Sequence, residues 1–398
     1  MVFTLPLSGL TPRTGVLARL FAARQGRGVA SAAVMEMPSL AQRLHVPVLA
    51  QSDETAAGLA IRASYAAMAA AGQWDGLLAA LRIADQARSV GPDGQRLAIL
   101  ISQGARDALG QSLARRDWPA AATDLGVIAA VQGQHPGDYT AAHLLAQAHL
   151  DLGWARRSTS ASTDADVPRA GWLAFLHQTA LAEAVLEPFD PLQEMSPLLA
   201  GTRYLLVRGL EDGEELYLDW YEDWSDLDPS DAAAHAAHAV HLLPNWFGTY
   251  ALLDQQARAA MARTRAATGA AAYAVFHLSA TEALGDLPVR VDLALFVQGL
   301  QDFAGQTGCQ HRANIVADAL SELDHSLAED VDCDPASRQL VRAALGRHLR
   351  DHLREFHFAT WQNGHPCMHY AVTQVFGDEL ARGEHIFVGP KGLVARPS

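Results

Sequence analysis

Three histidines stand three residues apart at positions 235, 238 and 241, and imidazole is the commonest side-chain ligand of transition metals. On a helix, residues three apart are separated by about 300°, so the outer two point about 120° apart. Neighbouring pairs could share an ion, but His235, His238 and His241 cannot easily meet at one. An earlier copy of the same pattern keeps His143 and His149 but has Ala146 at the middle position. This repetition favours a structural role, in which the rings pack and hydrogen-bond between helices, and a metal-dependent enzyme is kept as the alternative.

A second group of possible metal ligands is His365, Cys367 and His369. No other cysteine lies within four residues of Cys367, and the spacing matches no structural zinc pattern. A cysteine near a histidine can also act as a nucleophile, but no orienting acid or oxyanion loop accompanies it. Both histidine groups are therefore weak metal candidates. The sequence predicts no cofactor.

An acidic and aromatic stretch occupies residues 211–231, with ten carboxylates and no lysine or arginine. On a helix, residues three and four apart are neighbours, so its four central aromatic residues would share one face. We predict that this face is an aromatic anchor within a negative rim, which would bind an Arg-rich or otherwise cationic protein segment. The alternative is that the tryptophans are core and the acids a solvated surface. The predicted partner-binding residues are Tyr217, Trp220, Tyr221 and Trp224.

One pattern occurs twice in the chain, as HLLAQAHLDLGW over residues 143–154 and as HAAHAVHLLPNW over residues 235–246. A proline, with an aspartate two residues after it, stands upstream of each copy: Pro136 and Asp138, Pro229 and Asp231. A repeated helical unit of this size indicates an array of paired helices. The pattern therefore describes how the chain is built and assigns it no chemistry.

Composition narrows the class of protein. The 398 residues are 49% apolar and carry a net charge of −14, which argues against a general nucleic-acid binder because that function needs a basic surface. No apolar run approaches the length of a membrane span. Three cysteines fit a reducing cytoplasm. Residues 1–35 have the arginine-rich, acid-poor composition of a targeting peptide, but they lack a secretory apolar core, so we favour a tail or capping helix.

Local signals place the elements. A short polar turn precedes Trp74 and Trp118, which marks the boundary between two paired helices. Asp228 and Pro229 are expected to begin one helix, and Asp334 and Pro335 another. We divide the chain into an arm over residues 1–50 with a short helix near 14–25, helical repeats over 51–157 and 168–330 joined by a polar linker over 158–167, and a C-terminal helix and hairpin over 331–398.

The segment LLPNWFG over residues 242–248, after the Asp-Pro-x-Asp of residues 228–231 and before an alanine-rich helix, resembles a bacterial family. This family comprises tetratricopeptide-like helical proteins that carry a domain of unknown function, and the resemblance covers residues 165–290. Members often have Lys and Ser where this chain has Asn245 and Thr249. The resemblance implies a helical fold and assigns no catalytic residue.

The sequence therefore predicts an all-α protein, built of antiparallel helix pairs stacked as a tetratricopeptide-like α-solenoid with a small C-terminal β-hairpin. No Walker loop, Gly-x-Ser-x-Gly elbow or His-Glu-x-x-His motif is present, which argues against an enzyme. We expect a bacterial, cytoplasmic protein-interaction module for a basic partner segment, because stacked helix pairs form extended surfaces. A structural assembly subunit is a further alternative.

Overall fold

The structure is a computed structural model that describes residues 40–158, 166–284, 291–305, 308–330, 333–361 and 364–397. Within these ranges sixteen α-helices, α3 to α18, alternate with only a few short strands, which confirms the prediction of a mainly α-helical protein. The predicted helix near 14–25, the possible targeting segment and most of the linker lie outside the described residues. No helix in the described part is long and apolar enough to cross a membrane.

The first part of the chain contains β1 (Leu44–His45), β2 (Val48–Leu49), α3 (Asp53–Ala70), α4 (Trp74–Gln86), α5 (Leu97–Ala105), α6 (Asp107–Ala114), α7 (Trp118–Gln134), α8 (Tyr139–Ser158) and α9 (Asp166–Leu186). The middle contains α10 (Pro197–Tyr204), the 3-10 helix η2 (Leu205–Arg208), α11 (Gly213–Leu227), α12 (Ala232–His241), α13 (Tyr250–Thr268) and α14 (Ala271–Leu284). The last part contains α15 (Leu293–Gly305), α16 (Gln310–Glu329), α17 (Pro335–Asp351), β3 (Phe356–His357), α18 (His365–Ala381), β4 (His385–Val388) and β5 (Leu393–Arg396).

Most helices begin where the sequence predicts. The turns before Trp74 and Trp118 separate α3 from α4 and α6 from α7. The side chain of Asp334 caps α17, which begins at Pro335. The prediction that Asp228 caps α12 is wrong: the cap is Asp231, whose Oδ1 accepts a hydrogen bond from the backbone N–H of residue 233 at 3.0 Å. Asp228 follows the last residue of α11 instead, and its carboxylate is held by an arginine from another part of the chain.

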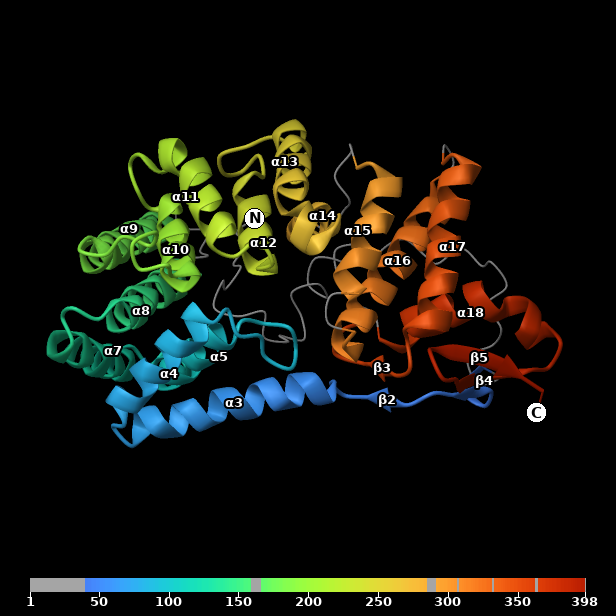
Figure 1. Cartoon of the computed structure of the whole chain (residues 1–398), viewed down its shortest axis with the longest axis horizontal. Coiled ribbons are helices and arrows are strands. Elements are labelled where there is room, and N and C mark those ends of the chain that lie inside the picture. Colours follow the sequence, from blue (N-terminus) through green and yellow to red (C-terminus); the bar gives the residue numbers. More distant parts are fainter. Residues whose placement is uncertain are drawn as a thin grey trace.

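Helices pack mainly against their neighbours in sequence, and the series curves so that its end meets its beginning (Figure 1). Helix α3 runs along the lower edge and contacts α16. β1 pairs in parallel with β4, and β2 pairs in parallel with β3. Neighbour packing agrees with an array of paired helices, whereas an open array has no contact between its ends. The tetratricopeptide-like arrangement therefore remains a prediction.

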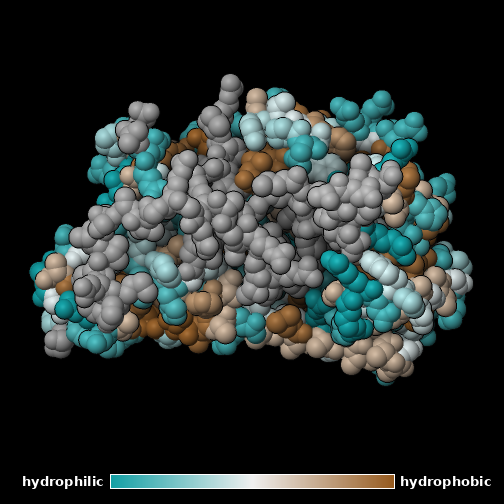
Figure 2. Space-filling model, turned by 180° about the vertical axis from the view of Figure 1, so that it is seen from behind, coloured by the Kyte–Doolittle hydropathy of each residue, from teal (hydrophilic) through white to brown (hydrophobic). Residues whose placement is uncertain are grey.

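The predicted C-terminal hairpin is confirmed, because β4 and β5 pair antiparallel with Ile386 opposite Ala395. β1 extends it to a three-stranded sheet. The sequence prediction missed α18, which lies between β3 and this hairpin. Helix α18 packs on α16 and α17, and its inner side contains the buried residues Met368, Val372 and Phe376. Seen from behind, polar and apolar side chains are mixed at both ends of the molecule, and apolar ones show along both its upper and lower edges (Figure 2).

Asn314 on α16 lies beside the place where β2, near the start of the described residues, pairs with β3. Its side chain is fully buried, and its Nδ2 donates to the backbone carbonyl oxygens of Gln310 and Glu355 at 2.9 and 3.0 Å. Its Oδ1 accepts from the backbone N–H of His357 at 2.9 Å and from Nε1 of Trp361 at 2.8 Å. One amide thereby satisfies four polar groups around β3, the strand that pairs with β2.

We predict that Asn314→Ala lowers the free energy of unfolding by about 3 kcal/mol, because two buried donors next to β3 lose their acceptor. Chemical denaturation followed by circular dichroism measures the effect. Asn245→Ala, at an exposed asparagine, is the matched control and should change stability by less than about 0.5 kcal/mol. Equal stability of the two variants would contradict the role assigned to Asn314.

Candidate functional site

Helix α11, which carries the predicted aromatic anchor, presents different residues to the core and to the surface. Tyr221 and Trp224 are 2% and 6% exposed. Tyr221 stacks on the ring of His238 at 3.8 Å, and Trp224 packs against Tyr204 at 5.9 Å. The prediction of a single exposed face of four aromatic residues is therefore corrected for these two, which belong to the hydrophobic core.

Tyr217 and Trp220 lie at the border between the core and the surface, half-buried. The ring of Tyr217 stacks on Phe247 at 5.4 Å. The guanidinium of Arg203, on α10, lies 4.4 Å from the centre of the Trp220 ring. This arginine is a feature that the local pattern of residues 211–231 could not reveal, because it comes from the preceding helix.

The outward side of α11 is a strip of carboxylates, which we call the acidic strip: Glu215, Asp219, Glu222, Asp223 and Asp226. Glu222 and Asp226 form ion pairs with Arg263 on α13. The pKa of Asp223 is raised, first by partial burial and then by the nearby charges of Asp190, Asp219 and Asp226, whereas Arg203 lowers it. Burial is the main cause of this shift, and the cation Arg203 is the strongest of the neighbouring charges.

The three histidines of α12 are buried among aromatic rings and do not converge on one point. Nδ1 of His238 is 2.7 Å from the hydroxyl of Tyr204, and Nδ1 of His235 is 3.0 Å from that of Tyr221. The ring of His241 packs on Tyr204 at 4.8 Å, and neither of its nitrogens has a hydrogen-bond partner in the described part of the chain. These contacts agree with the structural role that the sequence favoured.

Burial keeps these histidines neutral, because a charged imidazolium loses its hydration there. It lowers the pKa of His235 to about 4. The pKa values of His238 and His241 are also lowered far below the ordinary value, first by burial and then by nearby positive charges, which for His241 include Arg208. An unprotonated imidazole is also the form that binds metals. Whether these histidines can bind a metal ion therefore depends on where their nitrogens lie, not on their protonation.

Among the described residues, no group of three or more His, Cys, Asp or Glu side chains is placed to hold a metal ion. The rings of His365 and His369, on the first turns of α18, are 6.0 Å apart. Between them, the thiol of Cys367 lies 2.9 Å from a carboxylate oxygen of Glu322 on α16. The structure therefore brings together neither the α12 histidines nor this C-terminal group as a metal centre.

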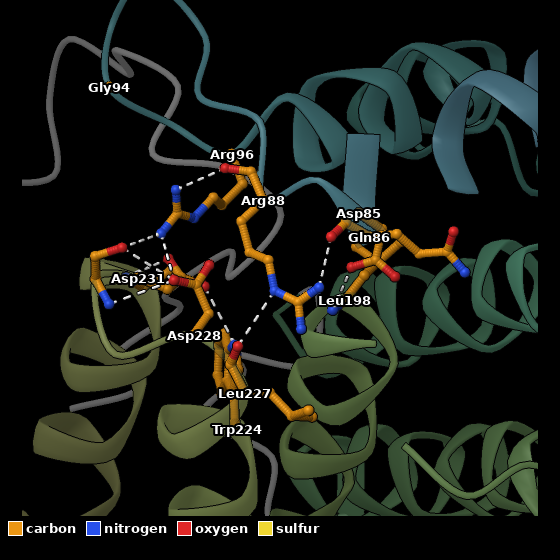
Figure 3. A network of polar contacts seen from close by, with 12 residues as sticks. Asp85, Gln86, Arg88, Gly94, Arg96, Leu198, Trp224, Leu227, Asp228 and Asp231 are labelled. Carbon is orange, nitrogen blue, oxygen red and sulfur yellow. Dashed lines mark hydrogen bonds and ion pairs between the residues drawn. The ribbon is translucent and has the colours of Figure 1, made fainter. Parts of the chain in front are cut away.

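Two arginines from the loop between α4 and α5 position α11 and α12 (Figure 3). Arg96 donates through Nη2 to Oδ1 of Asp228 at 2.5 Å and through Nη1 to the backbone carbonyl oxygen of Arg88 at 3.0 Å. Arg88 donates to the backbone carbonyl oxygens of Leu227 and Met195 at 3.3 and 3.1 Å. The last turn of α11 is thereby attached to the first helices of the chain.

Asp231, the cap of α12, is the second buried carboxylate of this network. Its Oδ2 accepts from Nε1 of Trp224 at 3.2 Å. Burial and the nearby charge of Asp228 raise its pKa to about 6, whereas Arg96 lowers it. The one guanidinium of Arg96 therefore stabilises two buried acids.

Comparison of the chain with protein-family models, with curated proteins and with solved structures finds no match.

We predict that Arg96→Met lowers the free energy of unfolding by about 3–5 kcal/mol, since it leaves the buried carboxylate of Asp228 without its counter-ion. The double variant Arg96→Met/Asp228→Asn should recover most of this loss. Urea denaturation at neutral pH measures both. Arg62→Met, at the more exposed pair with Asp107, is the control and should cost below about 1 kcal/mol. A loss for Arg96→Met no larger than that of this control would disprove the assignment.

The buried histidines predict acid sensitivity. An unfolded histidine binds a proton as the pH falls below about 6.5, whereas buried His241 stays neutral, so this group lowers folding stability progressively below that pH. His241→Phe removes this effect and breaks no hydrogen bond. We expect the loss of unfolding free energy between pH 7 and pH 5 to shrink by about 2 kcal/mol.

Denaturant titrations at the two pH values measure this change. The raised pKa of Asp231 acts in the opposite direction between about pH 6 and pH 4, but it is common to both proteins and cancels in the difference. His177→Phe, on the exposed side of α9, is the control and should retain the wild-type pH dependence. An unchanged pH dependence in His241→Phe would show that this histidine does not stay neutral.

Proposed function

We propose that the protein is an interaction module whose acidic strip on α11 binds a basic segment of a partner protein. The observation that carries this proposal is the excess of acidic side chains on the outward side of α11, where the five carboxylates of the acidic strip have two arginines near them, Arg203 and Arg263. A partner arginine or lysine would relieve the repulsion between these carboxylates. Its binding would be electrostatic, and therefore weakened by salt.

Trp220 supports the choice of an arginine-containing partner. Arg203 already stacks on its ring at 4.4 Å, which is the geometry of a cation–π contact with a guanidinium. An incoming arginine would lie beside this pair, with its charge toward Asp219 and Asp223. Tyr221 and Trp224 have no direct part in this proposal, because both are core residues. Their role is to hold the inner side of α11 so that the strip faces outward.

The resemblance to tetratricopeptide-like bacterial proteins is kept as part of the same proposal, since curved series of helix pairs commonly present surfaces for protein segments. The proposed location is the cytoplasm. None of Cys309, Cys333 and Cys367 forms a disulfide in the described part of the chain, which fits a reducing compartment. No observation in the described residues favours the metal-dependent alternative.

We predict that Asp219→Asn/Asp223→Asn weakens binding of a fluorescent nona-arginine peptide by about three- to tenfold at low salt. Fluorescence anisotropy at two salt concentrations measures the affinity and its salt dependence, which should become shallower in the variant.

The matched control is Asp351→Asn/Asp378→Asn, which removes the same charge from exposed positions at α17 and α18. Equal weakening in both variants would show that the peptide senses only the net charge, and the proposal would fail. Retention of the wild-type affinity by Asp219→Asn/Asp223→Asn would also exclude the strip as the binding surface.

A further inference from the structure

The tryptophans that end the two copies of the repeated pattern contact each other in space. The rings of Trp154 and Trp246 are 6.4 Å apart in an edge-to-face arrangement. Two arginines share them. The guanidinium of Arg157, near the end of α8, lies 5.1 Å from each ring centre, and that of Arg208, at the end of η2, lies 5.6 Å from Trp154 and 4.3 Å from Trp246.

The inner of these two arginines is almost completely buried. Arg208 is 6% exposed, and its Nε and Nη2 are enclosed without a hydrogen-bond acceptor among the residues that the structure describes. Nη1 of Arg157 is likewise buried without an acceptor from that part of the chain. Among the described residues, no carboxylate forms an ion pair with the guanidinium of Arg157 or of Arg208, although the chain contains 44 acidic residues. The two guanidiniums therefore lie side by side, and three of their buried nitrogen atoms have no acceptor among the described residues.

The electrostatics of this cluster agree with its geometry. The pKa of Arg208 is lowered to about 9, chiefly by burial; Tyr204 opposes this shift and the neighbouring charge of Arg157 adds to it. Both guanidiniums remain charged at neutral pH. The faces of the tryptophan rings stabilise the cations through their quadrupoles, but a ring face offers no acceptor to the N–H groups at the guanidinium edge. Buried donors without acceptors are costly.

The outer part of the cluster is open to solvent. Arg157 and the rings of Trp154, Trp172 and Trp246 are only half-buried, and Arg157 also stacks on Trp172 at 4.4 Å. A small ligand would therefore meet Arg157 first, and it would reach the enclosed N–H groups of Arg208 only if the side chains around them moved aside. The fork of a guanidinium matches the oxygens of a compact oxyanion, and two such groups match a charge of −2.

We propose that Arg157 and Arg208 form a binding site for a phosphate group, supplied by inorganic phosphate or by a small phosphate monoester. The oxygens of the phosphate accept from the unused guanidinium N–H groups, and the tryptophans hold both guanidiniums in place. The site is separate from the acidic strip and has the opposite charge preference. It does not depend on the proposed interaction with a basic partner.

Isothermal titration calorimetry of the full chain at constant ionic strength tests this proposal, with inorganic phosphate, glycerol phosphate and acetate as the three probes. Both phosphate compounds should bind, and acetate should bind at least tenfold more weakly because it has a single charge and two oxygens. Binding of inorganic phosphate alone would restrict the site to the free anion. No preference of the wild-type protein for phosphate over acetate would overturn the proposal.

Arg208→Met and Arg157→Gln should each weaken phosphate binding at least tenfold. Arg203→Gln is the matched control, because it removes an arginine from a different tryptophan and should keep the wild-type affinity within twofold. Circular dichroism verifies that each variant is folded. If Arg208→Met does not fold, the half-buried Arg157→Gln decides, and wild-type affinity in a folded variant at either position would overturn the assignment.

Discussion

The buried ion pair between Arg96 and Asp228 connects the loop between α4 and α5 to the junction of α11 and α12. The position of the acidic strip on α11 depends on this connection. Arg96 follows α4, and Asp228 separates α11 from α12, so the pair fixes the middle helices against the first ones. Its side chains are 13% and 3% exposed, a position where a lone charge would be costly. Asp231 depends on the same guanidinium, and it caps the helix that carries the buried histidines. The orientation of α11 and α12 therefore follows from one cation shared by two acids.

The two sides of α11 have different roles: the inner side packs in the core, and the outer side carries the acidic strip. The inner side supplies Tyr221, whose hydroxyl bonds to His235 and whose ring stacks on His238. Neutral imidazoles suit this place because they are flat enough to stack and polar enough to satisfy a buried hydroxyl. The outer side supplies five carboxylates, which have Arg203 and Arg263 as neighbouring cations. The same helix thus stabilises the core and presents the charge on which the proposed partner binding rests.

Two positive charges lie close together at a different place, where the end of α8 meets η2. Arg157 and Arg208 lie against tryptophans that the repeated pattern brings together, without acidic partners among the described residues. A protein of net charge −14 could have neutralised them with its own carboxylates. Aromatic rings stabilise the cations and leave their donors unused, which is an arrangement suited to an anionic ligand.

The sequence by itself determined the helical class, the turns before Trp74 and Trp118, the cap at Asp334 and the C-terminal hairpin, because these follow from local backbone preferences. It also favoured a structural role for the α12 histidines, from their angular spacing and from the first copy of the pattern, which keeps His143 and His149. Only the tertiary structure decided that Tyr221 and Trp224 face inward, that Asp231 rather than Asp228 caps α12, and that the first strands pair with β3 and β4. Helical periodicity shows which residues share a face, but which face is buried depends on neighbours that are distant in sequence. Arg96, Arg203 and Arg208 are such neighbours, and their partners become visible only when the chain is folded.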